Sequence, residues 1–272
     1  MGYRAVFCDM DETFLRSDKS VPEENLRAVE ELRSRGVEFI PCTGRHLGGL
    51  PAPVRERVRY VVTSSGAMVH DLARGTVLWS CGILQAQCLE ILVALAGLRF
   101  HLDIYVDGRV YTRSTTCDVL EQAPIPEPIR AYLQAVEEPF DGDAEAFFAR
   151  YAEVERLNLM FATHADRERA VAALQGLGGL HCAPTIGVNI ELTAAGATKG
   201  AAMTAACERL GIPLSETIAF GDSENDISML RGAGRGIAVA NAVSAAKDAA
   251  DTLTSSCDEG GVLIGLRECG LL

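Results

Sequence analysis

The chain has 272 residues, which is long for one domain and enough for two domains with separate cores. Its 37 Asp and Glu residues outnumber its 25 Lys and Arg residues, which gives a formal net charge of −12. A chain this acidic repels nucleic acid and anionic lipid headgroups, so we expect neither as its main partner. Hydrophobic residues at 48% and charged residues at 23% are typical of a folded globular protein.

Membrane and secretion signals are not evident in the sequence. The most apolar stretch, residues 83–98, is interrupted by polar residues and is too short to cross a bilayer. An acidic cluster near the N-terminus stands where a secretory signal has its apolar run. We therefore expect a cytoplasmic protein without a membrane segment. Nine cysteines without a Cys-x-x-Cys pair favour neither a disulfide framework nor a zinc site, so we expect reduced thiols.

The first third of the chain alternates strand and helix patterns. Residues 5–8 are apolar at consecutive positions, which is typical of a strand buried on both faces of a parallel sheet. A helix follows Pro22 and ends at Gly36, and residues 37–42 and 60–63 predict two further strands. Strand, helix and strand at this spacing form a βαβ unit, which indicates a doubly wound parallel sheet.

The middle of the chain departs from this alternation. Residues 102–111 predict a β-hairpin that turns at Asp107-Gly108. Helix patterns cover residues 83–98, 129–137, 143–151 and 167–177, and strand patterns cover residues 154–163 and 187–192. This mixture of a hairpin and helices indicates a second domain inserted into the first.

The last third of the chain returns to the regular alternation. The patterns predict a helix over residues 198–210, a strand over 217–220, a helix over 225–230 and a strand over 236–240. We therefore expect an α/β fold with a doubly wound parallel sheet in the core, formed by residues 1–81 and 189–272. Residues 82–188 form a smaller inserted α/β domain.

Four polar clusters follow predicted strands or begin predicted helices of the core, where open α/β sheets bind their ligands. The first contains Asp9 and Asp11, two carboxylates that repel each other unless a cation or a shared proton relieves them. A magnesium site with a nucleophile beside an acid/base group is one explanation. A solvated acidic turn is the other.

The other three clusters are weaker signals when each is taken alone. Thr43 and Gly44 can hold a phosphate oxygen with a hydroxyl and an N–H group, although such sequences are also common turns. Lys199 begins a helix, where a cation is mildly unfavourable unless an anion lies nearby, and a surface lysine is the alternative. Residues 222–226 place three carboxylates at a strand-to-helix junction, which again indicates a cation; the alternative for Asp226 is that it stabilises the first turn of the helix. Together the four clusters predict one site at the active edge of a parallel sheet.

These clusters resemble the four motifs of the haloacid dehalogenase superfamily, and most closely those of the Cof-type phosphatases. The matching segments are Asp9-Met10-Asp11-Glu12-Thr13, Thr43-Gly44-Arg45, Lys199-Gly200 and Gly221-Asp222-Ser223-Glu224-Asn225-Asp226. The tail Asp258-Glu259-Gly260-Gly261-Val262 is similar to the Asp-Gly-Val ending of the family. The resemblance covers both ends of the chain, and the middle corresponds to the α/β cap that these phosphatases carry between the second and third motifs.

Two positions depart from the pattern of the family, and one histidine has no assigned role. Glu12 stands where the family has Gly: a side chain pointing inward would weaken phosphate binding, and one pointing away would change little. Ser64-Ser65-Gly66-Ala67 stands where many relatives carry Asn-Gly-Ala. His46, directly after the second motif, is expected on a surface loop, and a position facing the pocket is the alternative.

The resemblance implies a role for each matched residue. Asp9 would attack phosphorus and become an aspartyl-phosphate, and Asp11 would protonate the leaving group and then deprotonate water. For the first of these steps, the pKa of Asp11 must be raised. Mg²⁺ would be bound by Asp9, the backbone carbonyl of Asp11, Asp222 and, in support, Asp226. The phosphoryl oxygens would be held by Thr43, Gly44, Lys199 and Asn225.

The resemblance therefore implies a Mg²⁺-dependent phosphatase of a small phosphorylated metabolite, such as a sugar phosphate. A phosphomutase with the same intermediate and a non-catalytic module that binds a phosphorylated ligand are the alternatives. A metal-free dehalogenase would not need Asp11, Asp222 and Asp226 together. A dinucleotide oxidoreductase is disfavoured because no Gly-x-Gly-x-x-Gly follows the first strand. The sequence carries no signal for an oligomeric state.

Overall fold

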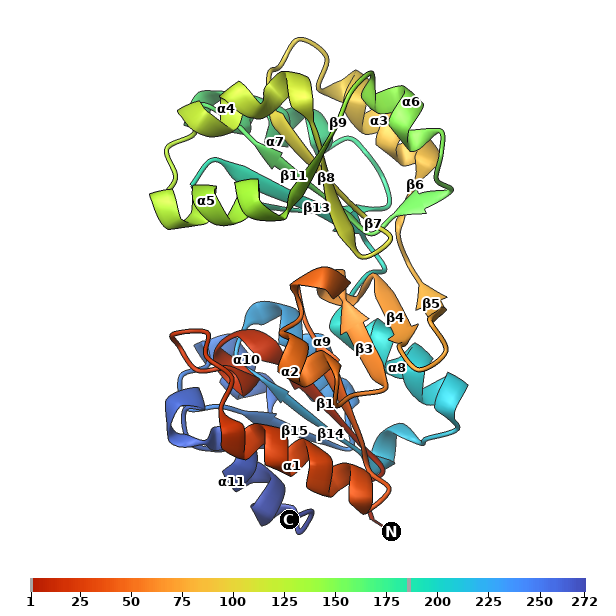
Figure 1. Cartoon of the computed structure of the whole chain (residues 1–272), viewed down its shortest axis with the longest axis vertical. Coiled ribbons are helices and arrows are strands. Elements are labelled where there is room, and N and C mark those ends of the chain that lie inside the picture. The colour runs from red at the N-terminus through yellow and green to blue at the C-terminus, as the bar shows by residue number, and fades with distance from the viewer. Residues whose placement is uncertain (1, 185–186) are drawn as a thin grey trace. The chain divides into compact units, whose positions relative to one another are not determined.

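The chain folds into two units, each built on its own sheet (Figure 1). The computed structural model describes residues 2–184 and 187–272. The first unit comprises Met1–Arg45, Gly49–Ser80 and Ala197–Leu272, and the second comprises His46–Gly48 and Cys81–Gly196. The sequence pattern places the second join between residues 188 and 189. The second unit extends to Gly196 because the strand over Asn189–Ala194 pairs within its sheet.

The sheet of the first unit has eight strands in the order β16-β15-β14-β1-β2-β3-β4-β5. Their bounds are β1 (Ala5–Asp9), β2 (Glu38–Cys42), β3 (Tyr60–Thr63), β4 (Met68–Asp71), β5 (Thr76–Ser80), β14 (Thr217–Gly221), β15 (Arg235–Ala238) and β16 (Thr252–Leu253). The strands from β16 to β3 pair in parallel, whereas β4 and β5 add an antiparallel extension. The predicted α/β class with a parallel sheet is confirmed, and the extension was not predicted.

Helices lie on both faces of this sheet (Figure 1). They are α1 (Glu23–Ser34), α2 (Ala52–Arg55), α8 (Lys199–Leu210), α9 (Ile227–Gly232), α10 (Ser244–Ala249) and α11 (Gly261–Glu268), with short turns η1 (Met10–Phe14), η2 (Leu47–Gly49), η3 (Ser64–Gly66), η5 (Leu214–Glu216), η6 (Glu224–Asp226) and η7 (Cys257–Glu259). Apolar residues of α8, α9 and α10 share a core with Ala5 and Phe7 of β1. Helices α1 and α11 contact each other on the opposite face. All five residues of β1 are buried, as the consecutive apolar run predicts for a central parallel strand.

The sheet of the second unit has six strands in the order β12-β13-β11-β7-β8-β9. Its strands are β7 (His101–Val106), β8 (Arg109–Arg113), β9 (Glu137–Phe140), β11 (Arg156–Met160), β12 (Leu180–Pro184) and β13 (Asn189–Ala194), and β6 (Ile83–Leu84) pairs separately with β10 (Glu153–Val154). The helices are α3 (Gln85–Ala94), α4 (Cys117–Gln122), α5 (Glu127–Val136), α6 (Ala144–Phe148) and α7 (His164–Leu174), with the turn η4 (Ser114–Thr116). The predicted hairpin is β7–β8, and the predicted turn at Asp107-Gly108 is confirmed.

The two faces of β7 differ in character. Leu102, Ile104 and Val106 belong to the apolar core of the unit. The alternate residues His101, Asp103 and Tyr105 point to the other face, and all three are buried. The sheet of the second unit therefore has one apolar face and one face with buried polar side chains. No helix in the described part of the chain, residues 2–184 and 187–272, is long and apolar enough to cross a membrane.

Candidate active site

The polar clusters of the first unit lie at the carboxyl edge of its parallel strands. Asp9 is the last residue of β1, which pairs with β14 on one side and with β2 on the other. Asp222 directly follows β14, and Thr43 directly follows β2. The parallel pairing therefore brings to one edge residues that are more than 200 positions apart in the sequence.

Lys199 lies between two carboxylates at this edge. Its Nζ is 2.5 Å from Asp9 Oδ1 and 2.6 Å from Asp226 Oδ1, and its side chain is fully buried. Burial alone would lower the pKa of Lys199, but the charges of Asp226 and Asp9 outweigh it and raise the pKa. Lys199 is therefore a buried ammonium ion and not the surface lysine of the alternative reading.

Asp226 fixes the loop that carries Asp222. Its Oδ2 accepts hydrogen bonds from the backbone N–H groups of Asp222 and Ser223, both at 3.0 Å. Gly221 precedes this loop, and a Cβ at that position would lie 2.5 Å from Asp226 Cβ. The close approach requires glycine there, so the Gly-Asp start of the fourth motif has a steric cause.

Asp222 is oriented by a residue of the first motif. Thr13 Oγ1 donates a hydrogen bond of 2.9 Å to Asp222 Oδ1, and Thr13 is buried. Burial and the charge of Asp226 raise the pKa of Asp222. The sequence pattern gave Thr13 no role, because its partner follows another strand that joins it only in the folded sheet.

The carboxylates of Asp9, Asp222 and Asp226 form a group that fits a cation. One oxygen of each lies within 4.8 Å of the others. Burial raises the pKa of Asp9, and the charges of Asp226 and Asp222 add to this effect while Lys199 opposes it. Three carboxylates beside one ammonium ion leave negative charge in a buried place. Hard oxygen ligands with excess negative charge suit Mg²⁺.

Asp11 is held by Arg45 rather than by this group. Arg45 Nε donates to Asp11 Oδ2 at 2.8 Å, and Arg45 Nη2 donates to Asp11 Oδ1 at 2.6 Å. Burial would raise the pKa of Asp11, but the hydrogen bonds and charge of Arg45 outweigh it and lower the pKa. This shift is opposite to the one that a general acid needs.

Glu12 adopts the backbone conformation that glycine favours. Its φ is 63° and its ψ is 12°, in the left-handed region. The side chain is 53% exposed, and its Oε1 lies 3.1 Å from Lys19 Nζ. Of the two orientations considered for Glu12, the structure shows the one in which the carboxylate meets solvent and a lysine.

The segment Ser64–Ala67 supports the start of α8. Gly66 has φ +102°, and a Cβ there would lie 2.3 Å from the Thr198 carbonyl carbon and 2.7 Å from the Lys199 nitrogen. Ser64 and Ser65 also have positive φ angles, 51° and 58°. Asn and Gly tolerate this region better than Ser, so the two serines carry backbone strain at this turn.

The remaining phosphate-binding candidates lie in different environments. Thr43 is fully buried, and its Oγ1 accepts a hydrogen bond of 3.1 Å from the Arg45 backbone N–H; Gly44 lies between these two residues. Asn225 is exposed, and its Oδ1 accepts a hydrogen bond of 2.8 Å from Ser223 Oγ. Lys199 thus contacts both Asp9 and Asp226, whereas the Asn225 side chain bonds within its own loop.

The prediction of a surface position for His46 is wrong. The side chain is 8% exposed, and its Nδ1 lies 2.9 Å from the backbone oxygen of Gly108. Gly108 is the turn of the β7–β8 hairpin, with φ +71°. The contact joins residues 62 positions apart, and no local pattern in the sequence could reveal it.

Comparison with known proteins gives a consistent family. Residues 6–266 match the model of the haloacid dehalogenase-like hydrolases. Phosphatase YwpJ of Bacillus subtilis is 27% identical over 95% of this chain and 97% of its own length. Pyridoxal phosphate phosphatase YbhA of Escherichia coli is 27% identical over 91% of each chain.

Solved structures share the fold over nearly the whole chain. A haloacid dehalogenase-like hydrolase from Bacteroides thetaiotaomicron has a TM-score of 0.82 and 19% identity, and the match covers 98% of this chain and 99% of that one. A HAD subclass IIB sugar phosphatase has a TM-score of 0.77 and 21% identity, over 99% of this chain and 100% of the other.

Proposed function

Because the chain belongs to the haloacid dehalogenase-like hydrolases, we propose that it is a Mg²⁺-dependent phosphatase of a small phosphorylated metabolite. The reaction passes through an aspartyl-phosphate on Asp9. The observation that carries this proposal is the contact of Asp9 with buried Lys199, beside the carboxylates of Asp222 and Asp226. A nucleophilic carboxylate, a fixed cation and a carboxylate group for a metal are the parts that phosphoryl transfer needs.

The names of the relatives support a small substrate. YbhA is named for pyridoxal phosphate, and the similar solved structure is named for sugar phosphates. YwpJ is named a phosphatase without a substrate. The three names share phosphatase activity, and the two that specify a substrate name a small phosphorylated molecule, which is the substrate class that we propose here.

Asp9 attacks phosphorus with one carboxylate oxygen. The leaving oxygen departs with the electron pair of the bond that breaks, and the acyl-phosphate is then cleaved by water. Lys199, at 2.5 Å from Asp9 Oδ1, is close enough to stabilise charge on the transferring group. Thr43, Gly44 and Asn225 hold the other phosphoryl oxygens, and Asn225 donates from Nδ2 while its Oδ1 accepts from Ser223.

Asp9, the backbone carbonyl of Asp11, and Asp222 would hold the Mg²⁺ ion. When bound, the ion offsets the repulsion between the Asp9 carboxylate and an anionic phosphate. Asp226 has both oxygens engaged, one with Lys199 and the other with backbone N–H groups. Its part is therefore to position Lys199 and the Asp222 loop.

Asp11 serves as the acid and then the base in this scheme. While Arg45 holds it, its low pKa keeps it ionised, which suits the base but not the acid. We propose that the Arg45–Asp11 pair opens when substrate binds, because the phosphate group competes for the guanidinium. Release from Arg45 raises the pKa of Asp11 and lets it carry a proton to the leaving oxygen.

The inserted unit is the proposed substrate-selecting cap. We propose that the cap comprises residues 82–188 together with β13 (Asn189–Ala194), which pairs within the sheet of the second unit, and that the hydrolase core comprises the chain before and after this insert. The catalytic groups that recognise phosphate and metal lie outside residues 82–188 in the sequence. Contacts that distinguish one phosphate ester from another must then come largely from the insert.

A screen of phosphorylated metabolites for phosphate release, with and without Mg²⁺, tests the proposal. We expect release that requires Mg²⁺ and that Asp9→Asn abolishes. Production of an isomeric phosphate ester without free phosphate would establish a phosphomutase. Tight binding of a phosphate ester without release would establish a binding module, and either result would overturn the phosphatase.

A further inference from the structure

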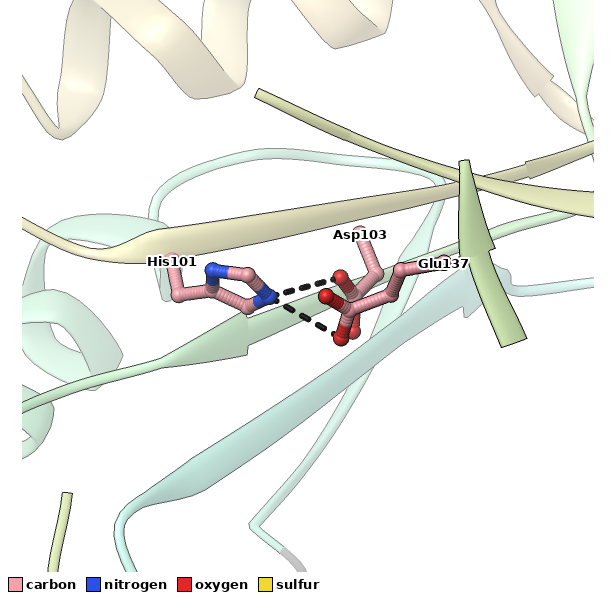
Figure 2. Close-up of side chains that lie close together, drawn as sticks. All are labelled: His101, Asp103 and Glu137. Atoms are coloured by element: carbon pink, nitrogen blue, oxygen red, sulfur yellow. Dashed lines mark hydrogen bonds and ion pairs between the residues drawn. The ribbon is translucent and has the colours of Figure 1, made fainter. Parts of the chain in front are cut away.

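A second group of side chains with metal-ligand chemistry lies in the other unit. Figure 2 shows His101, Asp103 and Glu137, whose Nε2 and carboxylate oxygens point toward one another. Nε2 of His101 lies 3.0 Å from Asp103 Oδ1 and 3.1 Å from Glu137 Oε1. One ligand atom of each residue lies within 4.8 Å of the others. None of the three takes part in the proposed phosphatase chemistry.

The backbone fixes this group on one face of the sheet. His101 and Asp103 are two positions apart on β7, so both point to its polar face. Glu137 begins β9, which is separated from β7 by β8. Thr112 of β8 lies between them, paired with Asp103, and its Oγ1 is 3.2 Å from His101 Nε2. Side chains from three neighbouring strands thus surround Nε2 of His101.

The single N–H group at Nε2 of His101 cannot donate a full hydrogen bond to both carboxylates. The side chains of His101, Asp103 and Glu137 are 0%, 3% and 5% exposed, so water does not reach them freely. Nε2 makes its hydrogen bond to Glu137 Oε1. Asp103 Oδ1, although 3.0 Å from the same nitrogen, accepts no hydrogen bond from any residue in the described part of the chain. Asp103 Oδ1 is thus a buried carboxylate oxygen that points at His101 and Glu137 and has no hydrogen-bond donor among the described residues.

The charge of the group is also unbalanced. Burial alone would lower the pKa of His101, but Asp103 and Glu137 outweigh it and raise the pKa to about 10. Burial raises the pKa of Glu137 as well. Even with a protonated histidine, two carboxylates leave one negative charge in a buried place. A divalent cation in place of the Nε2 proton makes the group neutral.

We propose that His101, Asp103 and Glu137 bind a divalent transition-metal ion such as Zn²⁺ through Nε2, Oδ1 and Oε1. Bonds of about 2.0–2.2 Å to such an ion put neighbouring ligand atoms roughly 3.0–3.5 Å apart, and Nε2 lies at such a distance from each of the two carboxylate oxygens. Imidazole with carboxylates suits Zn²⁺ and its neighbours in the series better than Mg²⁺. The Thr112 hydroxyl lies where it can complete the ligand set.

The ion has a structural role. β9 is the edge strand of the sheet, and β8 is its one neighbour in the strand order. A bond from Glu137 to an ion held by His101 and Asp103 ties β9 to β7 across β8.

Zinc content of the full-length protein tests this site. Protein stripped with a chelator is loaded with Zn²⁺ in excess Mg²⁺ and dialysed, and the zinc per chain is counted by mass spectrometry. We expect wild type to retain one zinc ion more than Glu137→Gln or His101→Gln. His181→Gln, which changes an exposed histidine of the same unit, serves as the matched control and keeps the wild-type count. Zinc should raise the Tm of wild type and of the control but not of Glu137→Gln.

A second measurement needs no variant. X-ray absorption of zinc-loaded wild type should show one imidazole nitrogen among oxygen ligands. Sulfur ligands, or a spectrum without imidazole, would place the metal at a cysteine or at the Asp9 group and overturn the proposal. Equal zinc counts in wild type and a folded Glu137→Gln would do the same. None of these outcomes depends on phosphatase activity, so the two proposals fail separately.

Discussion

Arg45 donates two hydrogen bonds to the Asp11 carboxylate, from Nε at 2.8 Å and from Nη2 at 2.6 Å. A bidentate pair of this kind is among the stronger side-chain contacts in proteins. It joins the first and second motifs of the core. It also holds the proposed acid/base in its ionised form, so the acid step requires that the pair open.

Substitution Arg45→Gln should change the pH dependence of the reaction. The guanidinium lowers the pKa of Asp11, so its removal raises that pKa. Asp11 acts as the base, and must be deprotonated, when water cleaves the aspartyl-phosphate. With a substrate for which this step limits turnover, the acidic limb of the kcat profile should therefore move to higher pH. Arg55→Gln, at an exposed arginine of α2, is the control and should leave the profile unchanged. An unmoved acidic limb in Arg45→Gln would show that Asp11 does not set it.

The proposed nucleophile is tested by Asp9→Asn. The amide has the shape of the carboxylate but is not a nucleophile, so we expect phosphate release to fall below detection while the fold remains. Circular dichroism checks the fold. Retention of more than about a tenth of the wild-type kcat, roughly 1.4 kcal/mol in the barrier, would contradict the role of Asp9.

Removal of Lys199 should cost stability as well as activity. Lys199→Met leaves Asp9 and Asp226 buried without their cation, and breaking a buried pair in this way typically costs about 3–5 kcal/mol. The change in the free energy of unfolding can be measured with urea. Lys247→Met, on α10, is the control and should change it by less than about 0.5 kcal/mol. A similar small change for both variants would mean that the buried ammonium contributes little.

The proposed metal requirement gives a further test. Chelation with EDTA should abolish phosphate release, and added Mg²⁺ should restore it, because the carboxylates of Asp9 and Asp222 need a hard cation. Calcium should inhibit, since it accepts more ligands at longer distances and would displace the nucleophile. Full activity after exhaustive chelation would exclude the proposed ligand set.

Much of the fold could be predicted from the sequence because its signals are local. The apolar run of β1, the glycine after α1 and the turn at Asp107-Gly108 each depend on neighbouring residues, and each corresponds to an element of the structure. The antiparallel strands β4 and β5 gave no such signal. β5 is largely exposed, and β4, although mostly buried, ends in the polar residues His70 and Asp71, so neither strand has a long apolar run.

The contacts within the candidate site depend on distant residues and could not be predicted in detail. The motifs indicated which residue types would gather at the sheet edge. The Thr13–Asp222 hydrogen bond and the Arg45–Asp11 pair depend on side chains that reach across separate loops. The group of His101, Asp103 and Glu137 joins β7 to β9 across a third strand, and no motif in the sequence connects these residues.

The last prediction concerns Gly66, which packs closely against the start of α8. Gly66→Ala would place a Cβ 2.3 Å from the Thr198 carbonyl and force the start of the helix to move. Lys199 is the first residue of that helix, so the move should pull its ammonium away from Asp9 and lower kcat. Displacement by about 1 Å can cost on the order of 100-fold in rate.

Gly75→Ala separates this steric effect from backbone strain. Gly75 also has a positive φ, +64°, but a Cβ there meets no atom within 4 Å. Both variants carry the strain of a non-glycine residue in the left-handed region, which is about 1–2 kcal/mol. Only Gly66→Ala also forces α8 to shift. We therefore expect a similar loss of stability from this strain in both, with an additional loss of stability and of kcat in Gly66→Ala alone. If Gly75→Ala lowered kcat as much as Gly66→Ala, strain in the unit would be the cause, and the contact of Gly66 with Thr198 would not position Lys199.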